Sequence, residues 1–258
     1  MHDEQKIHAR VAVVTGGASG IGATVVGLLA EQGMTVVVAD IDGAAASRRA
    51  ATLREAGHQA LALTMDVGSP ASIAQGFDTV RREFGRCDVL VNSAGIAKVI
   101  PFLSFPLDNW LATMNINVTG TMLCSQYAAQ MMVERGWGRI VNLASVAGMR
   151  AVGSGRTAYG TSKAAVIGLT RQIAAELAEH GITVNAVCPG PIDTAMTEAM
   201  HTPQFRAEYA KAIPMSRYGS TNEVAAVVAF LASDAASYVT GTAIPVDGGF
   251  MATGARGI

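Results

Sequence analysis

The sequence has little charge and no long apolar run, and both absences exclude classes of protein. Only 15% of its 258 residues are charged, and the net charge of −1 leaves no basic surface for nucleic acid or an anionic membrane. No stretch is long and apolar enough for a transmembrane helix, and the polar first ten residues do not resemble a signal peptide. We therefore expect a cytoplasmic protein that binds neither nucleic acid nor membrane.

Cysteine and histidine are also scarce. The three cysteines, Cys87, Cys124 and Cys188, form no CxxC pair, which is typical of a reduced intracellular protein whose cysteines are small buried hydrophobes. The five histidines are scattered, and none are paired at helical spacing. We therefore expect no metal site built by the protein.

Apolar residues, by contrast, make up half of the chain. No linker, repeat or low-complexity tract divides residues 1–258, so the length predicts one α/β domain with a sizeable core. An apolar content this high also favours an oligomer that buries part of its surface between subunits.

Residues 11–40 have the pattern of a strand, a glycine-rich turn, a helix and a second strand. Residues 11–14 are a short apolar run typical of a buried parallel strand, and glycines follow at 16, 20 and 22. A helical segment ends at Gly33, and the second apolar strand closes at Asp40. Glycines in this setting let the backbone approach a pyrophosphate at the helix N-terminus, so the unit predicts a dinucleotide site.

Asp40 indicates which dinucleotide is expected. A carboxylate at the end of the second strand accepts hydrogen bonds from the adenosine ribose hydroxyls and repels a 2′-phosphate. No Arg or Lys lies inside the glycine turn, while Arg48 and Arg49 lie further along, on the next expected helix. The expected cofactor is therefore NAD rather than NADP; the alternative is that Asp40 is a solvated turn residue.

Helix and strand patterns then alternate to the end of the chain. We expect helices at 44–56, 70–84, 108–134, 159–179 and 223–232, and strands at 60–64, 89–91, 138–143, 183–187 and 243–246. With the first unit, this predicts a Rossmann-like, doubly wound parallel sheet of about seven strands with helices on both faces. Residues 191–218 interrupt the pattern and are expected to form a lid. At the end of one strand, Asp66 is expected to accept from the adenine amino group or to cap a turn, with Val67 over the ring.

Tyr159 and Lys163 lie four residues apart at the start of a helix, so they share one face. An ammonium beside a phenol favours the phenolate and lowers the pKa of the tyrosine, which suits proton exchange with an alcohol or a carbonyl. Pairs with this spacing also occur on solvated helix faces, so the pair alone leaves both interpretations open.

With these features in order, the chain resembles the short-chain dehydrogenase/reductase family from Thr15 to Gly249. The motifs that carry the resemblance are the glycine turn at 15–22, Asn92-Ser93-Ala94-Gly95, Asn117, Ser145, Tyr159 with Lys163, and Pro189-Gly190. The second position of the family's NNAG motif holds serine here, and Asn115 is a weaker match for the helix asparagine than Asn117.

The resemblance implies a hydride transfer at a nicotinamide with four catalytic residues. Tyr159 would be the general acid or base, and Lys163 would lower its pKa and bind the nicotinamide ribose. Ser145 would hold the substrate oxygen, and Asn117 would keep a water that links Lys163 to solvent. The alternatives are that Ser145 caps a turn and that Asn117 tethers the backbone.

The residues expected at the cofactor come partly from the βαβ pattern and partly from the resemblance. They are Gly16, Ser19, Gly20, Ile21, Gly22, Asp40, Asp66, Val67, Asn92, Ala94, Gly95, Tyr159, Lys163, Pro189, Gly190, Ile192 and Thr194.

The expected substrate pocket is mostly apolar, which suits a secondary alcohol or a ketone. Its candidate residues are Ser145, Ala97, Met149, Val152, Pro191 and Met196. Arg150 and Arg156 would meet an anionic substrate or be ordinary exposed arginines, and a substrate role for His201 is equally open.

Three functions are compatible with these residues. The first is an NAD-dependent oxidoreductase acting on a secondary alcohol or ketone, with a polyol or sugar alcohol suggested by resemblance. The second is a 3-oxoacyl-thioester (acyl-carrier-protein) reductase; NADPH use would favour it, and Asp40 speaks against that. The third is a dinucleotide-sensing regulatory protein, against which an intact Ser145, Tyr159 and Lys163 speak. The resemblance also implies a homotetramer built through the helices at 108–134 and 159–179.

Overall fold

Seven parallel strands form one sheet in the order β3-β2-β1-β4-β5-β6-β7. The computed structural model describes residues 9–253, apart from the side chains of residues 196, 199 and 200. The strands are β1 Val11–Thr15, β2 Thr35–Asp40, β3 Ala60–Thr64, β4 Val89–Asn92, β5 Gly138–Leu143, β6 Ile182–Pro189 and β7 Ala243–Val246. The predicted doubly wound parallel sheet is confirmed.

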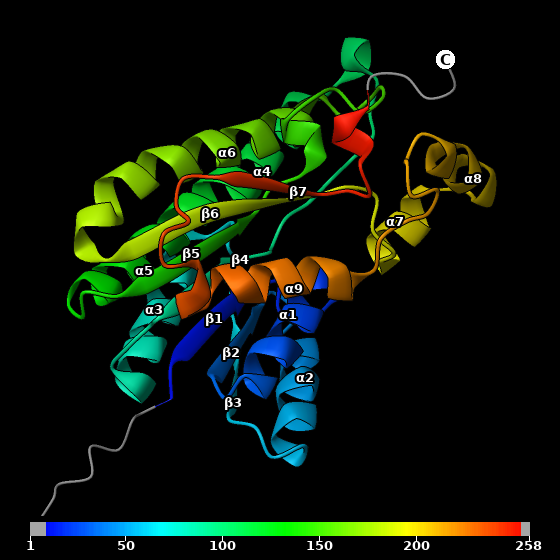
Figure 1. Ribbon diagram of the computed structural model, residues 1–258. Helices are drawn as coiled ribbons and strands as arrows, with labels where there is room; N and C mark the ends of the chain where they lie inside the picture. The colour runs from blue at the N-terminus through cyan, green and yellow to red at the C-terminus, as the bar shows by residue number, and fades with distance from the viewer. Residues whose placement is uncertain (1–8, 254–258) are drawn as a thin grey trace, which may run out of the picture.

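Helices cover both faces of this sheet (Figure 1). One face carries α1 Gly20–Glu31, α2 Gly43–Glu55 and α9 Thr221–Leu231, and the other carries α3 Pro70–Phe84, α4 Leu107–Met114, α5 Thr121–Val133 and α6 Thr157–Leu177. Every residue of β1, β4, β5 and β6 is buried, because helices exclude water from both sides of a parallel sheet. This arrangement explains why the strands are near-continuous apolar runs. Among residues 9–253, no helix is long and apolar enough to cross a membrane.

The predicted helix at 108–134 is interrupted, and the interruption positions a site residue. A π-helical turn, Asn115–Gly120, separates α4 from α5. A π turn inserts an extra residue into the helix and changes the direction in which its side chains point. Here Asn117 is turned into the interior, where it is 1% exposed, whereas Asn115 stays exposed. Helical periodicity could not reveal this break, because every residue of the segment is compatible with an α-helix.

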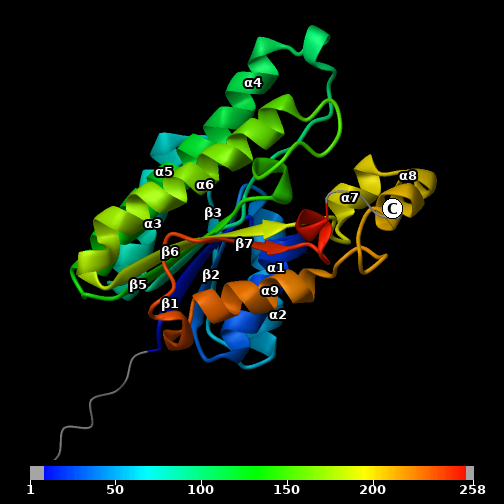
Figure 2. The same ribbon diagram turned by 45° about the horizontal axis from the view of Figure 1, so that its top comes forward.

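The lid predicted at 191–218 contains two short helices, α7 Ala195–Met200 and α8 Pro203–Lys211. Each begins at a threonine whose side chain accepts a backbone N–H three residues on: Thr194 from Thr197 and Thr202 from Phe205. Figure 2 shows that both helices lie beyond the carboxyl ends of β6 and β7, apart from the layers that cover the sheet. The lid therefore lies at the carboxyl ends of the strands, where open parallel sheets bind ligands.

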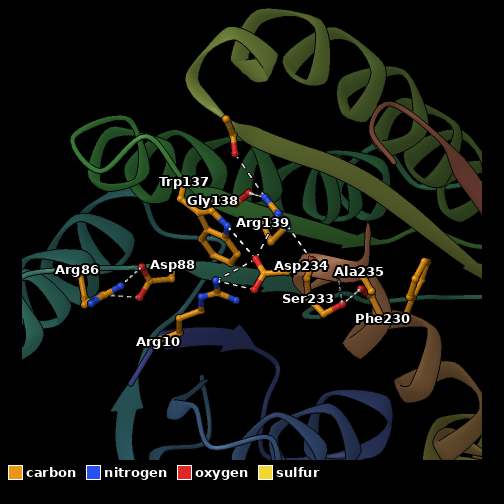
Figure 3. Close-up of polar contacts among 11 residues, drawn as sticks. Arg10, Arg86, Asp88, Trp137, Gly138, Arg139, Phe230, Ser233, Asp234 and Ala235 are labelled. Carbon is orange, nitrogen blue, oxygen red and sulfur yellow. Dashed lines mark hydrogen bonds and ion pairs between the residues drawn. The ribbon is translucent and has the colours of Figure 1, made fainter. Parts of the chain in front are cut away.

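The opposite end of the sheet, where the strands begin, is stabilised by contacts between charged side chains (Figure 3). Trp137 lies between two guanidinium groups, with that of Arg10 3.9 Å and that of Arg139 4.3 Å from its ring centroid. Asp234 accepts from Arg10 at 2.9 Å and from the Trp137 indole at 3.2 Å. Nearby, the buried carboxylate of Asp88 accepts two hydrogen bonds from Arg86, at 2.6 and 2.7 Å. These contacts join the N-terminal ends of the strands to the segments beside them.

Candidate active site

A cavity of about 350 Å³ lies where the strand order reverses, between the carboxyl ends of β1 and β4. Crevices at such switch points bind the ligand in open α/β sheets. The lining residues come from the glycine turn, the ends of β2, β3 and β4, and the start of the lid. They are Gly16, Ser19, Gly20, Ile21, Asp40, Ile41, Met65, Asp66, Val67, Ser93, Ala94, Gly95, Ile96, Ile116, Thr194 and Ala195.

The glycine turn leaves room for a ligand because its backbone packs directly against the backbone of the loop after β4. Gly16 has a φ of 63°, and a Cβ there would lie 2.9 Å from the backbone of Ala94. A Cβ on Gly22 would overlap the carbonyl oxygen of Gly16, so Gly22 supports the turn from beneath and does not line the cavity. Ser19 at the start of α1 makes no side-chain capping bond, which leaves the first amides of α1 for an anion. This geometry fits the pyrophosphate of a dinucleotide.

Asp40 lines the same cavity and also holds its wall together. Its carboxylate accepts from the backbone N–H of Ala18 and from that of Asp42, both at 3.1 Å. Arg49, one of the two arginines expected on the next helix, donates to the carbonyl oxygen of Ala23 at 2.7 Å and so is turned toward α1. None of the residues that line the cavity is a lysine or an arginine.

Two other predicted cofactor residues have structural partners of their own. Asp66 accepts from the N–H of Gly68 at 2.8 Å, which is the turn-capping role. It also lines the cavity, as the predicted contact with the adenine requires. The side chain of Asn92 points away from the cavity. Its amide donates to Asn142 at 2.8 Å and to Ser125 at 3.0 Å, which joins β4 to β5 and α5. The amide thus points to the face of the sheet that α5 covers, and a cofactor contact by the Asn92 side chain stays a prediction.

A second cavity, of about 150 Å³, adjoins the first and shares Ile21, Ser93, Gly95, Ile96 and Thr194 with it. The structure brings together here the predicted residues from β5, α6 and the end of β6. The other lining residues are Leu143, Ala144, Ser145, Tyr159, Lys163, Pro189, Gly190, Ile192 and Thr197. Ser145, Tyr159 and Lys163 therefore meet in one cavity beside the place for the dinucleotide.

The phenol of Tyr159 is tuned by several neighbours. Burial raises the pKa of Tyr159, while its hydrogen bond with Ser145 and the positive charge of Arg156 act to lower it. The net direction is upward, so the prediction that Lys163 lowers this pKa is wrong for the structure. Lys163 Nζ is 5.7 Å from the Tyr159 ring centroid and donates to the carbonyl oxygen of Leu143 at 2.6 Å. Burial lowers the pKa of Lys163 itself to about 8.

Asn117 has the backbone-tethering role that the sequence left open as the alternative. Its side-chain oxygen accepts from the N–H of Ile96 at 2.8 Å, and its amide donates to the Ile96 carbonyl at 2.9 Å. The amide also donates to Ser162 Oγ at 3.0 Å. Asn117 therefore fixes the loop after β4, which lines both cavities, to the catalytic helix α6.

The predicted substrate residues are more dispersed. Ser145 alone among them lines the catalytic cavity. Val152 packs against the apolar cluster of Val146, Ile213, Tyr218 and Phe250, and Pro191 lines a neighbouring hollow. Met149 is 39% exposed, Ala97 lines neither cavity, and the side chain of Met196 lies outside the described part of the chain.

Several lining residues were not predicted from the sequence. Ser93 lies between the two cavities, Ile116 faces the first from the π turn, and Thr197 faces the second from α7. The signal for Ser93 was present, because it stands inside the motif at 92–95. Nothing in the periodicity of α4 and α5 indicates that Ile116 reaches a ligand cavity.

Comparison with known proteins agrees with this geometry. Residues 16–251 match the family model described as enoyl-(acyl carrier protein) reductase. The chain is 45% identical to cis-4-hydroxycyclohexanecarboxylate dehydrogenase of Sinomonas cyclohexanicum, over 94% of this chain and 97% of that protein. It is 39% identical to 3-oxoacyl-[acyl-carrier-protein] reductase FabG of Aquifex aeolicus (strain VF5), over 96% of this chain and 100% of that protein.

Solved structures give the same result. A gluconate 5-dehydrogenase from Burkholderia cenocepacia J2315, in complex with NADP and tartrate, superposes with a TM-score of 0.91. The two sequences are 33% identical over 96% of this chain and 97% of that one. The motifs, the sheet order and these matches agree over nearly the whole chain. The chain belongs to the short-chain dehydrogenase/reductase family, and it is an oxidoreductase of the kind that binds a nicotinamide cofactor.

Proposed function

We propose that this protein is an NAD-dependent oxidoreductase that interconverts a secondary alcohol and a ketone, with polyols and sugar alcohols among its candidate substrates. The observation that carries the cofactor assignment is Asp40, whose carboxylate lines the dinucleotide cavity where no lysine or arginine does. A 2′-phosphate would meet this carboxylate with no cation to offset the repulsion, whereas ribose hydroxyls would donate to it.

The residues of the second cavity support an alcohol–ketone reaction. A bound nicotinamide dinucleotide supplies the hydride acceptor or donor. Ser145 donates a hydrogen bond to the substrate oxygen, and the Tyr159 phenol, to which Ser145 is hydrogen-bonded, takes up or gives the proton at that oxygen. Lys163, whose pKa burial lowers to about 8, is able to exchange a proton near neutral pH. The apolar wall that includes Ile96, Leu143 and Ile192 excludes water from the reacting atoms.

A reductase that acts on a 3-oxoacyl thioester is the second candidate. The observation in its favour is the 39% identity to the Aquifex aeolicus reductase over that protein's full length. The structure with NADP of the gluconate 5-dehydrogenase likewise supports testing the phosphorylated cofactor. Asp40 remains the argument against both, because it is part of the cavity wall itself.

One experiment separates these functions. A panel of secondary alcohols, polyols and cyclic hydroxy acids is incubated with NAD or NADP, and ketones and 3-oxoacyl thioesters with NADH or NADPH, while absorbance of the reduced nicotinamide is followed. We expect turnover of secondary alcohols with a higher kcat/KM for NAD. Turnover confined to thioesters and NADPH would support the second candidate, and binding of NADH without turnover of any compound would indicate a sensor.

We also propose a homotetramer that uses the outer faces of α5 and α6. A groove of about 670 Å³ beside these helices is lined by apolar side chains from both, Met122, Val133, Ile173 and Leu177 among them, and by polar side chains such as Gln126, Gln130 and Glu176. Apolar surface of this kind is commonly buried between subunits. Light scattering after size-exclusion chromatography should give four times the mass of one chain for the wild type. A smaller assembly for Val133→Glu would support this interface, and a monomeric wild type would contradict it.

A further inference from the structure

A side-chain contact beside the catalytic cavity joins the start of the catalytic helix to the lid. Arg156 stands three residues before Tyr159, and His201 stands four residues after Thr197, to whose carbonyl oxygen its N–H donates at 2.9 Å. Tyr159 and Thr197 both line the cavity. Arg156 Nη2 lies 3.0 Å from His201 Nε2, and Arg156 lines a neighbouring cavity of about 550 Å³ in the helical turn before Tyr159, close enough for its charge to act on the phenol.

The partner of this guanidinium is uncharged. A guanidinium only donates hydrogen bonds, so His201 Nε2 must accept, and the proton of the imidazole is on Nδ1, 3.0 Å from the Tyr218 hydroxyl. Burial lowers the pKa of His201, and the charges of Arg156 and Arg206 lower it further. His201 therefore orients Arg156 and does not neutralise it.

A second arginine lies near the same place. The guanidinium of Arg150 is 5.1 Å from the Phe250 ring centroid. Burial raises the pKa of Tyr209, on lid helix α8, and the charges of Arg156 and Arg150 both act against this rise. Within residues 9–253, neither arginine forms an ion pair. Two positive charges thus lie near the lid, each acting on Tyr209, without a carboxylate to balance them.

The other two arginines of the lid region behave differently. Arg206 pairs with Asp193, and Arg217 pairs with Glu223 at 2.6 Å. Among these four arginines the unbalanced charge is therefore that of Arg150 and Arg156, of which Arg156 is half-buried. A partly desolvated guanidinium with free N–H donors gains most from a carboxylate, which it binds through two parallel hydrogen bonds.

We propose that Arg156, assisted by Arg150, binds a carboxylate of the substrate, so that the preferred substrate is a secondary alcohol that also carries a carboxylate. Arg156 does not line the 150 Å³ cavity that receives the reacting oxygen, so this carboxylate is separated from the carbinol carbon by the body of the substrate. The inference rests on the proposed function and specifies its substrate class.

Matched substrates and variants test this assignment. The oxidation of 4-hydroxycyclohexanecarboxylate and 5-hydroxyhexanoate with NAD is compared with that of their carboxamides, which differ only in charge. For the wild type we expect kcat/KM to be about 10- to 100-fold higher for the acids. Arg156→Gln should abolish this preference, Arg156→Lys should keep part of it, and Arg150→Gln should reduce it severalfold. Arg217→Gln is the matched control in the lid and should keep the full preference.

The ratio between acid and carboxamide is the decisive readout, since Arg156 also influences the Tyr159 phenol and its loss will slow both substrates. Equal kcat/KM for acids and carboxamides in the wild type, or an Arg156→Gln ratio equal to that of the wild type, would overturn the proposal.

A binding measurement decides the point independently of turnover. Cyclohexanecarboxylate, which has no hydroxyl group to oxidise, is titrated calorimetrically into the complex with NADH. Binding that Arg156→Gln weakens at least tenfold supports the carboxylate site, and absent or unchanged binding overturns it. If no alcohol yields NADH while this binding is observed, the proposed function fails and the carboxylate site stands.

Discussion

Arginine side chains gather at both ends of the sheet, but two at the carboxyl end, Arg150 and Arg156, differ from the paired arginines at the other end. At the N-terminal edge Arg86 pairs with Asp88, and Arg10 with Asp234 (Figure 3). At the carboxyl edge, Arg150 and Arg156 have no ion pair within the described residues 9–253, although Arg156 is half-buried. A charge balanced within the chain contributes to the fold, whereas an unbalanced charge near a catalytic group is available to a ligand. The comparison predicts that changes at the two edges affect different properties.

Removing the buried acid at the N-terminal edge should have the largest effect on stability. Asp88 accepts from Arg86 and from the N–H of Val11 at 2.7 Å, so Asp88→Ala leaves a guanidinium and a buried amide without their acceptor. We expect the free energy of unfolding to fall by about 3–5 kcal/mol. Denaturant titration measures this loss, and Asp88→Asn, which keeps an acceptor for Val11, should lose less. A loss below 1 kcal/mol, or an altered kcat in the folded variant, would contradict the expectation that changes at the two ends of the sheet affect different properties.

At the carboxyl edge, Lys163→Met should affect activity and its pH dependence. Burial lowers the pKa of Lys163 to about 8, so Lys163 loses its proton as the pH rises through that value. Oxidation delivers a proton to Tyr159 and its surroundings, and its kcat/KM should therefore rise with pH through about 8, while that of reduction falls. The variant should lose this inflection and about 100-fold in kcat. A pH profile identical to that of the wild type would remove Lys163 from the proton path.

Two variants of Asp40 test the assignment of NAD as the cofactor. Asp40→Asn removes the charge and keeps one of the two acceptor oxygens that receive the N–H groups of Ala18 and Asp42, and Asp40→Ala removes both oxygens. We expect each to raise the efficiency with NADP relative to NAD by about tenfold, since the repulsion of a 2′-phosphate is lost. Asp40→Ala, which loses both acceptors, should reduce stability more than Asp40→Asn, which loses one. An unchanged ratio in both variants would contradict the assignment of NAD.

The smallest effect is expected at the lid, as a dependence on pH. The ordinary pKa of histidine is about 6.5, and His201 has a lowered pKa because it is buried and faces Arg156 and Arg206. As the pH falls below about 6.5, His201 is protonated more readily in the unfolded chain than in the folded lid. The free energy of unfolding therefore decreases from that pH downward. The elements packed around the imidazole contribute Tyr209 and Tyr218 but no carboxylate partner among the described residues.

Thermal unfolding between pH 7 and 5 measures this dependence. His201→Gln, which cannot take up a proton there, should show a shallower decline than the wild type, while the control His58→Gln should match the wild type. Parallel declines in all three proteins would show that His201 does not titrate in this range.

The elements of the fold could be predicted because their causes are local. Residues 11–14 and 89–91 are apolar without interruption since both faces of the sheet are buried, and the glycines at 16 and 22 are required by backbone that would otherwise overlap. The assembly of Ser145, Tyr159 and Lys163 in one cavity was expected from the resemblance, and the structure places them together.

The features that sequence reasoning missed depend on contacts between distant segments. The inward rotation of Asn117 comes from a π turn that periodicity does not register, and the raised pKa of Tyr159 comes from burial that the spacing to Lys163 cannot report. The contact of Arg156 with His201 joins residues 45 positions apart, on segments whose relative position only the folded chain defines.

Substitution of Tyr159 by phenylalanine tests the central claim most directly, because it removes one oxygen from the catalytic cavity and leaves the dinucleotide cavity intact. Fluorescence titration should give an NADH dissociation constant within about twofold of the wild type, while kcat/KM with NAD and a secondary alcohol falls about 10²- to 10⁴-fold. Turnover within tenfold of the wild type would show that another group transfers the proton and would contradict the account.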